Sequence, residues 1–193
     1  MGEHNFPRLV SLACHDLRTP LATVHGFAKT LVQAEPLAER TARHLGMIEE
    51  ASAQMGDLLD QVSLVARIEA GRWEPDLEES DSLELARAAA ERVDSSRVEV
   101  GGSGGRVMVP VESTERALAA FADCALRHGG LDRVGLEVQG AALTFSPTTR
   151  ESAPVLTAEE LRDLGSAAGR RLVEALGGSV ALDGDGFVVR FPG

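Results

Sequence analysis

Apolar residues recur in steps of three and four along the first third of the chain, which is the period of a helix with one apolar face. The first run extends from Glu3 to about Ala34, with stripe positions at Phe6, Val10, Ala13, Leu17, Leu21, Val24, Ala28 and Leu31. The second run ends near Ala70 and Gly71, with stripe positions at Leu45, Ile48, Ser52, Met55, Leu59, Val62 and Ala66. The pattern predicts two long amphipathic helices joined by a short loop at Pro36.

Two long apolar faces are more than a lone helical hairpin can bury. Pairing with a second copy of the chain gives a dimeric four-helix bundle with a continuous core, so we expect a homodimer. A coiled-coil spacer without chemistry has the same period, and periodicity alone leaves that alternative open.

The rest of the chain alternates short β-prone segments with helical patterns. An acidic linker at residues 74–80 precedes a helix that starts at Asp81-Ser82-Leu83-Glu84 and ends near Val93. Further helices are predicted at about 113–128 and at 158–176, and the last opens with a capping box at Thr157-Ala158-Glu159-Glu160. The β-prone segments are Arg97–Val100, Arg106–Val109, Val134–Val138, Ala142–Phe145, Ser179–Leu182 and Phe187–Phe191.

Two glycine-containing segments set the expected connections. The glycine cluster 101–105 predicts a flexible hairpin loop, and Asp183-Gly184-Asp185-Gly186 predicts a tight turn. Strands and helices in this order predict an α/β sandwich, in which helices cover one face of a mixed sheet. The expected fold class is therefore α+β, with the helical hairpin at residues 1–73, the linker at 74–80 and the sandwich at 81–193.

Charge and cysteine content exclude several classes of function. The 193 residues carry 30 Asp and Glu against 19 Lys and Arg, a formal net charge of −11, whereas nucleic acid requires a basic face. We therefore expect no nucleic-acid partner. The sequence has no apolar run as long as a membrane span, so we expect no membrane contact from this chain. Cys14 and Cys124 lie too far apart for a disulfide or metal spacing motif, which favours a reducing, cytoplasmic setting.

Candidate chemistry is concentrated in the segment His15-Asp16-Leu17-Arg18-Thr19-Pro20-Leu21. His15 lies nearly opposite the apolar stripe on a helix, so we expect its ring to face solvent. Thr19 is one turn further along the same face, Arg18 flanks it, and Pro20 predicts a kink directly after His15.

An exposed neutral imidazole on a rigid helix can accept a phosphoryl group on nitrogen. Asp16 can fix the tautomer of the His15 ring and stabilise positive charge on it. Thr19 can orient a water for hydrolysis, and Arg18 can offset the charge on the phosphoryl oxygens. The alternative is a solvated histidine without a role, and we expect the other histidines, His128 among them, to be surface or packing residues.

The same seven residues, on the first helix of a hairpin, resemble the H-box of sensor histidine kinases. The second helix closes with Ala66-Arg67-Ile68-Glu69-Ala70-Gly71, which is similar to that family's usual exit from its dimerisation and phosphotransfer domain. The resemblance covers residues of about 5–72. It implies that His15 is the phospho-accepting residue, Asp16 its acid/base partner and Thr19 the residue associated with phosphatase activity.

Residues 81–193 resemble the catalytic ATP-binding domain of the same family. The stretch Arg170-Arg171-Leu172-Val173-Glu174-Ala175-Leu176-Gly177-Gly178, with the strand, turn and strand after it, is similar to that domain's last helix and hairpin. Residues 111–129 resemble its asparagine-bearing helix.

The positions that bind nucleotide in that family differ in this chain. Cys124 stands where the family has a Mg²⁺-binding asparagine, and Ala120 at an asparagine position one turn earlier, and neither side chain suits a hard cation. Ser146-Pro147-Thr148-Thr149-Arg150 replaces the Asp-x-Gly-x-Gly segment that binds adenine. The lid is reduced to residues 150–156 and the phosphate loop to Asp163-Leu164-Gly165-Ser166-Ala167-Ala168, whose acid would repel a nucleotide. We expect no ATP binding, and a folded core retained for packing and docking.

Together these observations predict a histidine phosphotransfer protein derived from a histidine kinase. We expect it to take a phosphoryl group from a phospho-aspartate of one response-regulator receiver domain onto His15 and to pass it to another. Mg²⁺ would be held by the receiver, with no cofactor or metal bound by this chain. Two alternatives remain: a sensor histidine kinase core that autophosphorylates His15 with ATP, and a pseudokinase or phosphatase scaffold for a response regulator.

Overall fold

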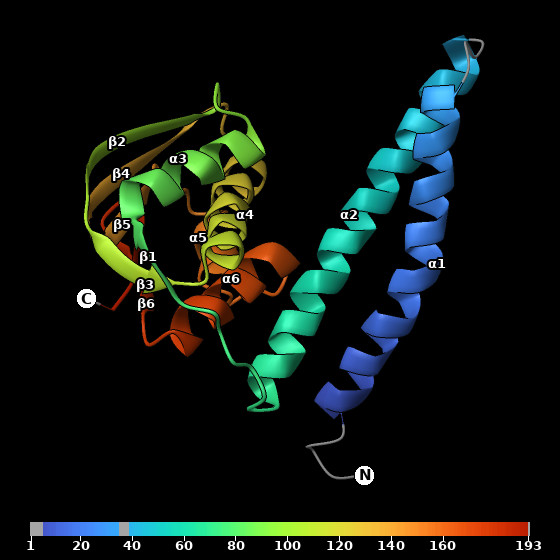
Figure 1. Ribbon diagram of the computed structural model, residues 1–193. Coiled ribbons are helices and arrows are strands. Elements are labelled where there is room, and N and C mark those ends of the chain that lie inside the picture. The colour runs from blue at the N-terminus through green and yellow to red at the C-terminus, as the bar shows by residue number, and fades with distance from the viewer. Residues whose placement is uncertain (1–5, 35–38, 193) are drawn as a thin grey trace. The chain divides into compact units, whose positions relative to one another are not determined.

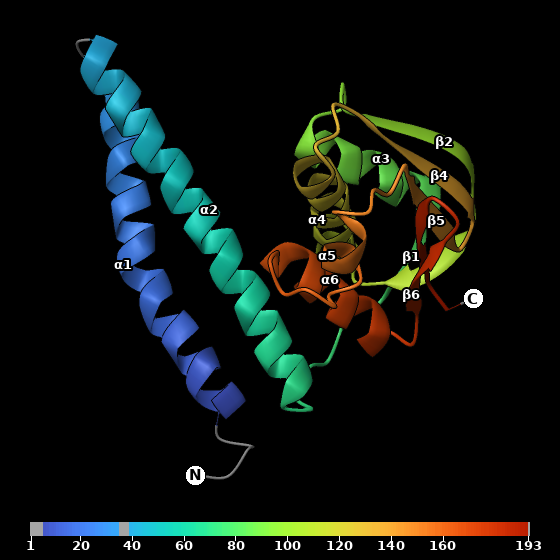
Figure 2. The ribbon, with the colours of Figure 1, turned by 180° about the vertical axis from the view of Figure 1, so that it is seen from behind.

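The computed structural model describes residues 6–34 and 39–192. The chain divides into two compact units, Met1–Arg72 and Trp73–Gly193, and each is described by itself. Figure 1 and Figure 2 show the two units from opposite sides. The first unit is helical, and every described strand belongs to the second.

The first unit is a hairpin of two long helices, α1 (Phe6–Ala34) and α2 (Glu39–Glu69), as the apolar period predicts. The helices run side by side in both views (Figure 1, Figure 2). After α2, Gly71 adopts a φ of +61°, and its N–H donates to the carbonyl of Ile68 at 2.9 Å, so glycine ends this helix as predicted. Among the described residues, no helix is both long enough and apolar enough to cross a membrane.

A single hairpin buries only part of the predicted stripe. Among the hairpin residues whose burial the structure describes, three stripe positions are at most 5% exposed, namely Ala28, Ser52 and Ala66, and so is Cys14, which follows the stripe position Ala13. Other stripe positions remain about half exposed, namely Leu17 at 56%, Val24 at 48%, Leu31 at 50%, Ile48 at 43% and Met55 at 48%. The exposed positions on α1 are seven residues apart, which is the period of a seam between packed helices.

The second unit contains seven strands and four helices within the described residues. In chain order they are β1 (Glu78–Asp81), α3 (Ser82–Val93), β2 (Val98–Gly104), β3 (Arg106–Val109), α4 (Val111–Gly129), β4 (Val134–Gly140), β5 (Ala142–Ser146), α5 (Ala153–Leu156), α6 (Leu164–Ala175), β6 (Ser179–Asp183) and β7 (Gly186–Arg190). Each β-prone segment of the sequence overlaps one of these strands. β1 is an addition, because it lies partly within the residues expected to form the linker.

Five of the strands form one mixed sheet in the order β2-β4-β5-β7-β6. β2 pairs with β4 in parallel, and the other neighbours are antiparallel. The helices α3, α4 and α6 lie on one side of this sheet (Figure 1, Figure 2), which is the arrangement expected of an α/β sandwich. β1 and β3 form a separate antiparallel pair.

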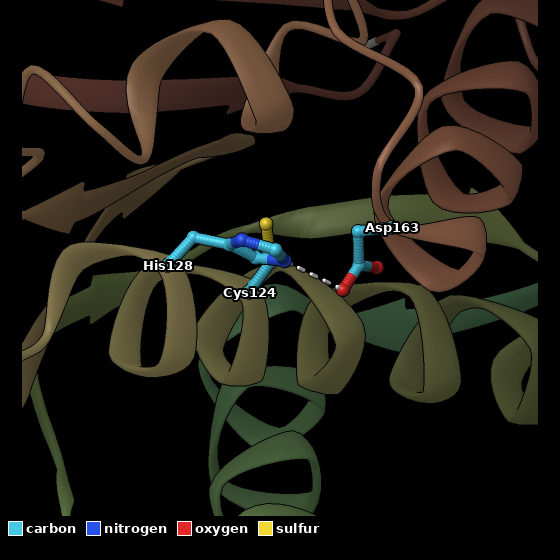
Figure 3. A group of neighbouring side chains, drawn as sticks. All are labelled: Cys124, His128 and Asp163. Carbon is cyan, nitrogen blue, oxygen red and sulfur yellow. Dashed lines mark ion pairs between the residues drawn. The ribbon is translucent and has the colours of Figure 1, made fainter.

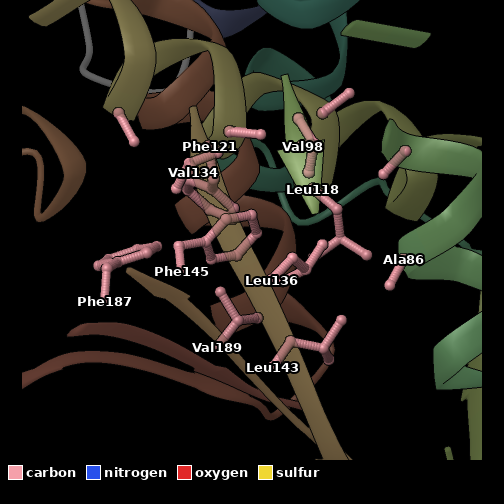
Figure 4. Close-up of a cluster of buried hydrophobic side chains, with 14 of the residues drawn as sticks. Ala86, Val98, Leu118, Phe121, Val134, Leu136, Leu143, Phe145, Phe187 and Val189 are labelled. Carbon is pink, nitrogen blue, oxygen red and sulfur yellow. The ribbon is translucent and has the colours of Figure 1, made fainter. Parts of the chain in front are cut away.

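The core of the second unit lies between the sheet and these helices. Three phenylalanines meet there: Phe121 of α4 lies with its ring centroid 6.0 Å from that of Phe145 on β5 and 5.0 Å from that of Phe187 on β7 (Figure 4). All three side chains are fully buried. The contacts between the rings hold α4 against the sheet. The same helix carries Cys124 and His128.

The glycine cluster 101–105 is not a hairpin loop, contrary to the prediction. β2 continues through Gly104 alongside β4, and β3 turns away to pair with β1. A side chain at Gly102, where φ is +94°, would collide with the carbonyl of Val138, and one at Gly104 would collide with the carboxylate of Asp81. Glycine is therefore needed here for close approach of neighbouring segments, and a loop is not formed.

The start of α6 also differs from the prediction. The helix begins at Leu164, and its N-cap is Asp163, whose carboxylate accepts from the N–H of Ser166 at 2.8 Å. The hydroxyl of Thr157, predicted to open this helix, donates instead to the carbonyl of Ala153 at 3.1 Å and so belongs to the end of α5. α5 itself occupies residues that were predicted to be a shortened lid.

Candidate functional site

Two groups of residues are candidates for a functional site, one on each unit. The first is the segment on α1 that contains His15. His15 and Asp16 belong to helix α1, as predicted, but their side chains lie outside the described residues. The expectations that the His15 ring faces solvent and that Asp16 supports it therefore stay predictions.

Thr19 and Arg18 are described, and both are exposed. Thr19 lies four residues after His15, so the two positions share a face of α1. The Arg18 guanidinium contacts the carboxylate of Asp60 on α2, with 2.5 Å between Nη2 and Oδ1. Asp60 could not be found from the sequence, because 42 residues separate it from Arg18 and no local spacing connects them.

The backbone around position 15 is set by local helix chemistry. Pro20 lies inside α1, where it has no N–H to donate and its ring crowds the carbonyl four residues earlier. That carbonyl belongs to Asp16. Cys14, immediately before His15, is 3% exposed and belongs to the buried side of the helix. The candidate phospho-acceptor position therefore lies between a buried residue and an exposed turn.

The second group lies on the sandwich, where α4 meets the start of α6 (Figure 3). Cys124 and His128 are one turn apart on α4, and Asp163 caps α6. The thiol sulfur, a ring nitrogen and a carboxylate oxygen of these residues all lie within 4.8 Å of one another. The Nε2 atom of His128 is 3.5 Å from Oδ2 of Asp163.

Burial and nearby charges determine the protonation state of the Cys124 thiol in this group. Cys124 is 0% exposed, and the Asp163 side chain is 4% exposed. Arg127 donates to Asp163 Oδ2 at 2.7 Å and to Asp123 Oδ2 at 2.6 Å, so one guanidinium bridges two carboxylates. Burial, with a smaller contribution from the charge of Asp163, raises the pKa of the Cys124 thiol from 9.0 to about 12. The thiol is therefore protonated at neutral pH.

Cys124 and Asp163 are recognisable in the sequence as departures from a nucleotide site, but their proximity to His128 is seen only in the structure. The spacing of Cys124 and His128, four residues apart on a helix, was an available signal, because ligands on one helical face have this spacing. Asp163 could not be added from the sequence, since its position depends on how α6 packs on α4.

The segment after β5 forms a closed local structure. The N–H of Thr149 donates to the hydroxyl of Ser152 at 3.0 Å, and the N–H of Ser152 donates to the Thr149 hydroxyl at 3.2 Å. The N–H of Thr148 donates to the carbonyl of Asp185 at 2.6 Å. Ser152 is fully buried. These residues satisfy one another, and the segment carries no acidic side chain before Glu151.

Comparison with known proteins adds family information. Residues 8–71 match the His Kinase A (phospho-acceptor) domain. The chain is 32% identical over 78 residues to the sensor protein DivL of Caulobacter vibrioides, which covers 40% of this chain and 10% of DivL. It is 31% identical over 145 residues to the histidine protein kinase DivJ of the same organism, which covers 72% of this chain and 22% of DivJ. The chain thus spans less than a quarter of either relative.

Solved structures show the same fold. Full-length ShkA in complex with AMPPNP has a TM-score of 0.65 at 22% identity, covering 96% of this chain and 45% of ShkA. The histidine kinase AdeS of Acinetobacter baumannii has a TM-score of 0.56 at 16% identity, covering 92% of this chain and 96% of AdeS. A helical hairpin followed by a sandwich like a histidine kinase ATP-binding domain is therefore the architecture of this chain.

Proposed function

Because the chain belongs to the sensor histidine kinase family, we propose that it carries a phosphoryl group on His15 and exchanges it with the aspartate of response-regulator receiver domains. The observation that carries this proposal is the match of residues 8–71 to the phospho-acceptor domain, since that span contains His15-Asp16-Leu17-Arg18-Thr19-Pro20-Leu21. The chain spans only part of its relatives, so activity and partners both belong to the proposal.

The proposed transfer is a displacement at phosphorus. A ring nitrogen of neutral His15 forms the N–P bond as the O–P bond to the receiver aspartate breaks, and the aspartate leaves as a carboxylate. Asp16 offsets the positive charge that the ring gains and holds its tautomer. The reverse displacement delivers the phosphoryl group to a second receiver. The receiver domain would hold the Mg²⁺ ion in both steps, and this chain would hold the His15 ring in position for the transfer.

Arg18 and Thr19 have distinct proposed roles beside His15. Arg18 already contacts Asp60, and because both side chains are nearly half exposed, this ion pair is worth about 0–1 kcal/mol. The guanidinium can therefore exchange Asp60 for phosphoryl oxygens at small cost. Thr19 presents an exposed hydroxyl one turn from position 15, where it can orient a water toward phosphorus and so favour hydrolysis over transfer.

The sandwich supports transfer without ATP. In place of a hard oxygen ligand, α4 offers the protonated, fully buried thiol of Cys124. The carboxylate of Asp163 occupies the start of α6, where a nucleotide phosphate would need positive potential. The segment after β5 is closed by the bonds between Thr149 and Ser152. We propose that this unit is retained as a folded core and a docking surface.

A histidine kinase core that uses ATP is the second candidate. The observation in its favour is the shared fold with ShkA, whose structure is a complex with AMPPNP. In that case His15 would take its phosphoryl group from the nucleotide. The two candidates differ in the phosphoryl donor and agree on the acceptor.

The test separates the donors. The purified chain is incubated either with a panel of receiver domains charged with ³²P-acetyl phosphate or with γ-³²P-ATP and Mg²⁺. We expect acid-labile label on the chain from charged receivers and none from ATP. His15→Ala should remove the label, whereas the matched variant His44→Ala, at an exposed position of α2, should keep it.

Each other outcome has a defined meaning. If ATP labels the chain, the proposed relay function is wrong and the histidine kinase candidate takes its place. If the receiver loses its label, no label appears on the chain, and Thr19→Ala abolishes this loss, then the chain acts as a phosphatase and the relay proposal is wrong. Label that survives His15→Ala overturns the assignment of the acceptor.

We further propose that the working form is a homodimer in a reducing, cytoplasmic setting. The half-exposed apolar positions Leu17, Val24 and Leu31 support a second copy as the partner of α1. Cys14 and Cys124 are both free and buried, in keeping with a reducing compartment.

A further inference from the structure

Three side chains with metal-binding atoms converge at the junction of α4 and α6. Cys124 and His128 come from one face of α4, and Asp163 comes from the N-cap of α6. Their ligand atoms lie within 4.8 Å of one another, and two of them, His128 Nε2 and Asp163 Oδ2, are 3.5 Å apart. Ligands around a tetrahedral zinc ion lie about 3.5 Å from one another, so this cluster is near the required size.

One of the three groups lacks a hydrogen-bond partner. The Nε2 atom of His128 is buried and, within the described residues, makes no hydrogen bond. An unsatisfied buried nitrogen costs free energy unless it finds a partner, and such atoms are rare in folded proteins. The ring nitrogen points toward the Asp163 carboxylate (Figure 3), and the Cys124 sulfur lies beside the ring.

The surroundings of Asp163 hold its carboxylate in place. Oδ1 accepts from the N–H of Ser166 at 2.8 Å, and Oδ2 accepts from Arg127 at 2.7 Å. Each oxygen has a second lone pair available. Hydrogen-bonded carboxylates of this kind are typical of metal sites, where groups outside the coordination sphere orient the ligand.

Local charge also favours a divalent ion. The positive charge of Arg127 is shared between Asp123 and Asp163, which leaves one net negative charge among these three side chains. A bound Cys124 thiolate would add a second negative charge, and a divalent cation would neutralise both. The guanidinium charge of Arg127 therefore does not prevent cation binding at this position.

We propose that Cys124, His128 and Asp163 form a site for a divalent transition-metal ion of the Zn²⁺ class. Sulfur, nitrogen and oxygen ligands together suit zinc, whereas Mg²⁺ and Ca²⁺ require oxygen ligands alone. On binding, the S–H bond of Cys124 is replaced by an S–metal bond, the proton passes to the buffer, and no oxidation state changes. Three protein ligands leave a fourth position for water or another small ligand.

The site would tie α4 to the start of α6. This is where the resemblance to histidine kinases locates a Mg²⁺-binding asparagine, so the chain would have a transition-metal site in place of a nucleotide site. The inference does not depend on phosphotransfer by His15, which lies on the other unit.

The test uses the full chain after treatment with a chelator. Zn²⁺ is titrated by calorimetry, and Co²⁺ is added in a separate experiment as a spectroscopic probe. We expect one ion per chain, a thiolate-to-cobalt charge-transfer band, and a higher Tm with Zn²⁺ but not with Mg²⁺. Cys124→Ala should remove the charge-transfer band and weaken Zn²⁺ binding at least tenfold.

His128→Gln is a second variant at a less buried position, and it should also weaken Zn²⁺ binding at least tenfold. Cys14→Ala, at the other buried cysteine, should keep both the band and the affinity. Circular dichroism of each variant checks that it is folded. The proposal is overturned if the wild-type chain shows no charge-transfer band, or if Zn²⁺ affinity is unchanged in both Cys124→Ala and His128→Gln.

Discussion

At the scale of single residues, the thiol of Cys124 links burial to pH. Its pKa lies at about 12 in place of 9.0, mainly because burial removes the thiolate from water and secondarily because Asp163 repels it. The folded chain therefore holds this proton more tightly than the unfolded chain does. The resulting stability is fully present below about pH 9 and is lost as the pH rises through the folded value.

In chelator, we expect the free energy of unfolding of the wild-type chain to fall between about pH 9 and pH 12, at up to about 1.4 kcal/mol per pH unit from this group. Cys124→Ala should lack this contribution. Urea unfolding of both proteins across this pH range measures the difference, so that other titrating groups cancel. Parallel pH dependences in the two proteins would contradict the prediction.

The ion pair between Arg18 and Asp60 provides a measure of how much an exposed contact stabilises the hairpin. Their side chains are 46% and 44% exposed, so solvent screens the attraction despite the contact of 2.5 Å. We expect a coupling of about 0.2–1 kcal/mol in a double-mutant cycle of Arg18→Ala and Asp60→Ala, measured by chemical unfolding. A coupling above about 2 kcal/mol would mean that the pair is shielded from water, for example by a second chain.

At the scale of elements, Gly104 shows how a neighbouring side chain can restrict a position to glycine. Asp81 caps α3 by accepting from the N–H of Leu83 at 2.8 Å and from that of Glu84 at 3.3 Å. A side chain at position 104 would collide with that carboxylate. The end of β2 and the start of α3 therefore share one small space.

Gly104→Ala should displace the Asp81 carboxylate and cost about 0.5–2 kcal/mol, which is the usual range for a lost N-cap. Gly26→Ala, inside α1, is the contrasting variant, because a side chain there meets nothing within 4 Å and alanine favours the helix by about 0.5–1 kcal/mol. Thermal unfolding followed by circular dichroism compares the two. Equal stability of wild type and Gly104→Ala would show that the cap can shift without cost.

The same elements show what the sequence can predict. α4 was recognisable because its apolar period is local, and the turn before β7 because Gly184, with a φ of +61°, lies between two β-prone runs. The extension of β2 through Gly104 was not recognisable, because glycine carries no side-chain pattern and parallel pairing with β4 joins residues far apart in the chain. The start of α6 was misplaced because Thr157 and Asp163 both satisfy the local signal for an N-cap, and tertiary packing selects Asp163.

The candidate sites follow the same rule. The segment around His15 was found because its residues are consecutive, so the motif is complete in the sequence. Asp60 and the convergence of His128 on Asp163 depend on contacts between helices, which no local pattern encodes. Sequence therefore identifies the proposed acceptor, and structure adds Asp60 on the hairpin and the grouping of His128 with Asp163 on the sandwich.

At the scale of the whole molecule, the two units differ in how they complete a core. The sandwich buries Phe121, Phe145 and Phe187 within one chain. The hairpin leaves Leu17 and Val24 about half exposed, although their spacing is that of a packed seam. A contiguous apolar stripe of this kind indicates that a further surface covers it, and a second hairpin has the matching period.

Val24→Glu tests this directly, because two-fold symmetry would place the new charge twice in one interface. Covering the exposed half of Val24 contributes about 1 kcal/mol per chain, so losing it from both chains costs about 2 kcal/mol, equivalent to about a thirtyfold weaker dimer, and repulsion between the two carboxylates adds to that. We expect light scattering during size-exclusion chromatography to show a dimer for the wild-type chain and a concentration-dependent shift toward monomer for Val24→Glu. Ala22→Glu adds the same charge at an exposed position on the opposite side of α1 and should remain dimeric. A wild-type monomer at every concentration, or identical behaviour of the two variants, would exclude the stripe as the dimer interface.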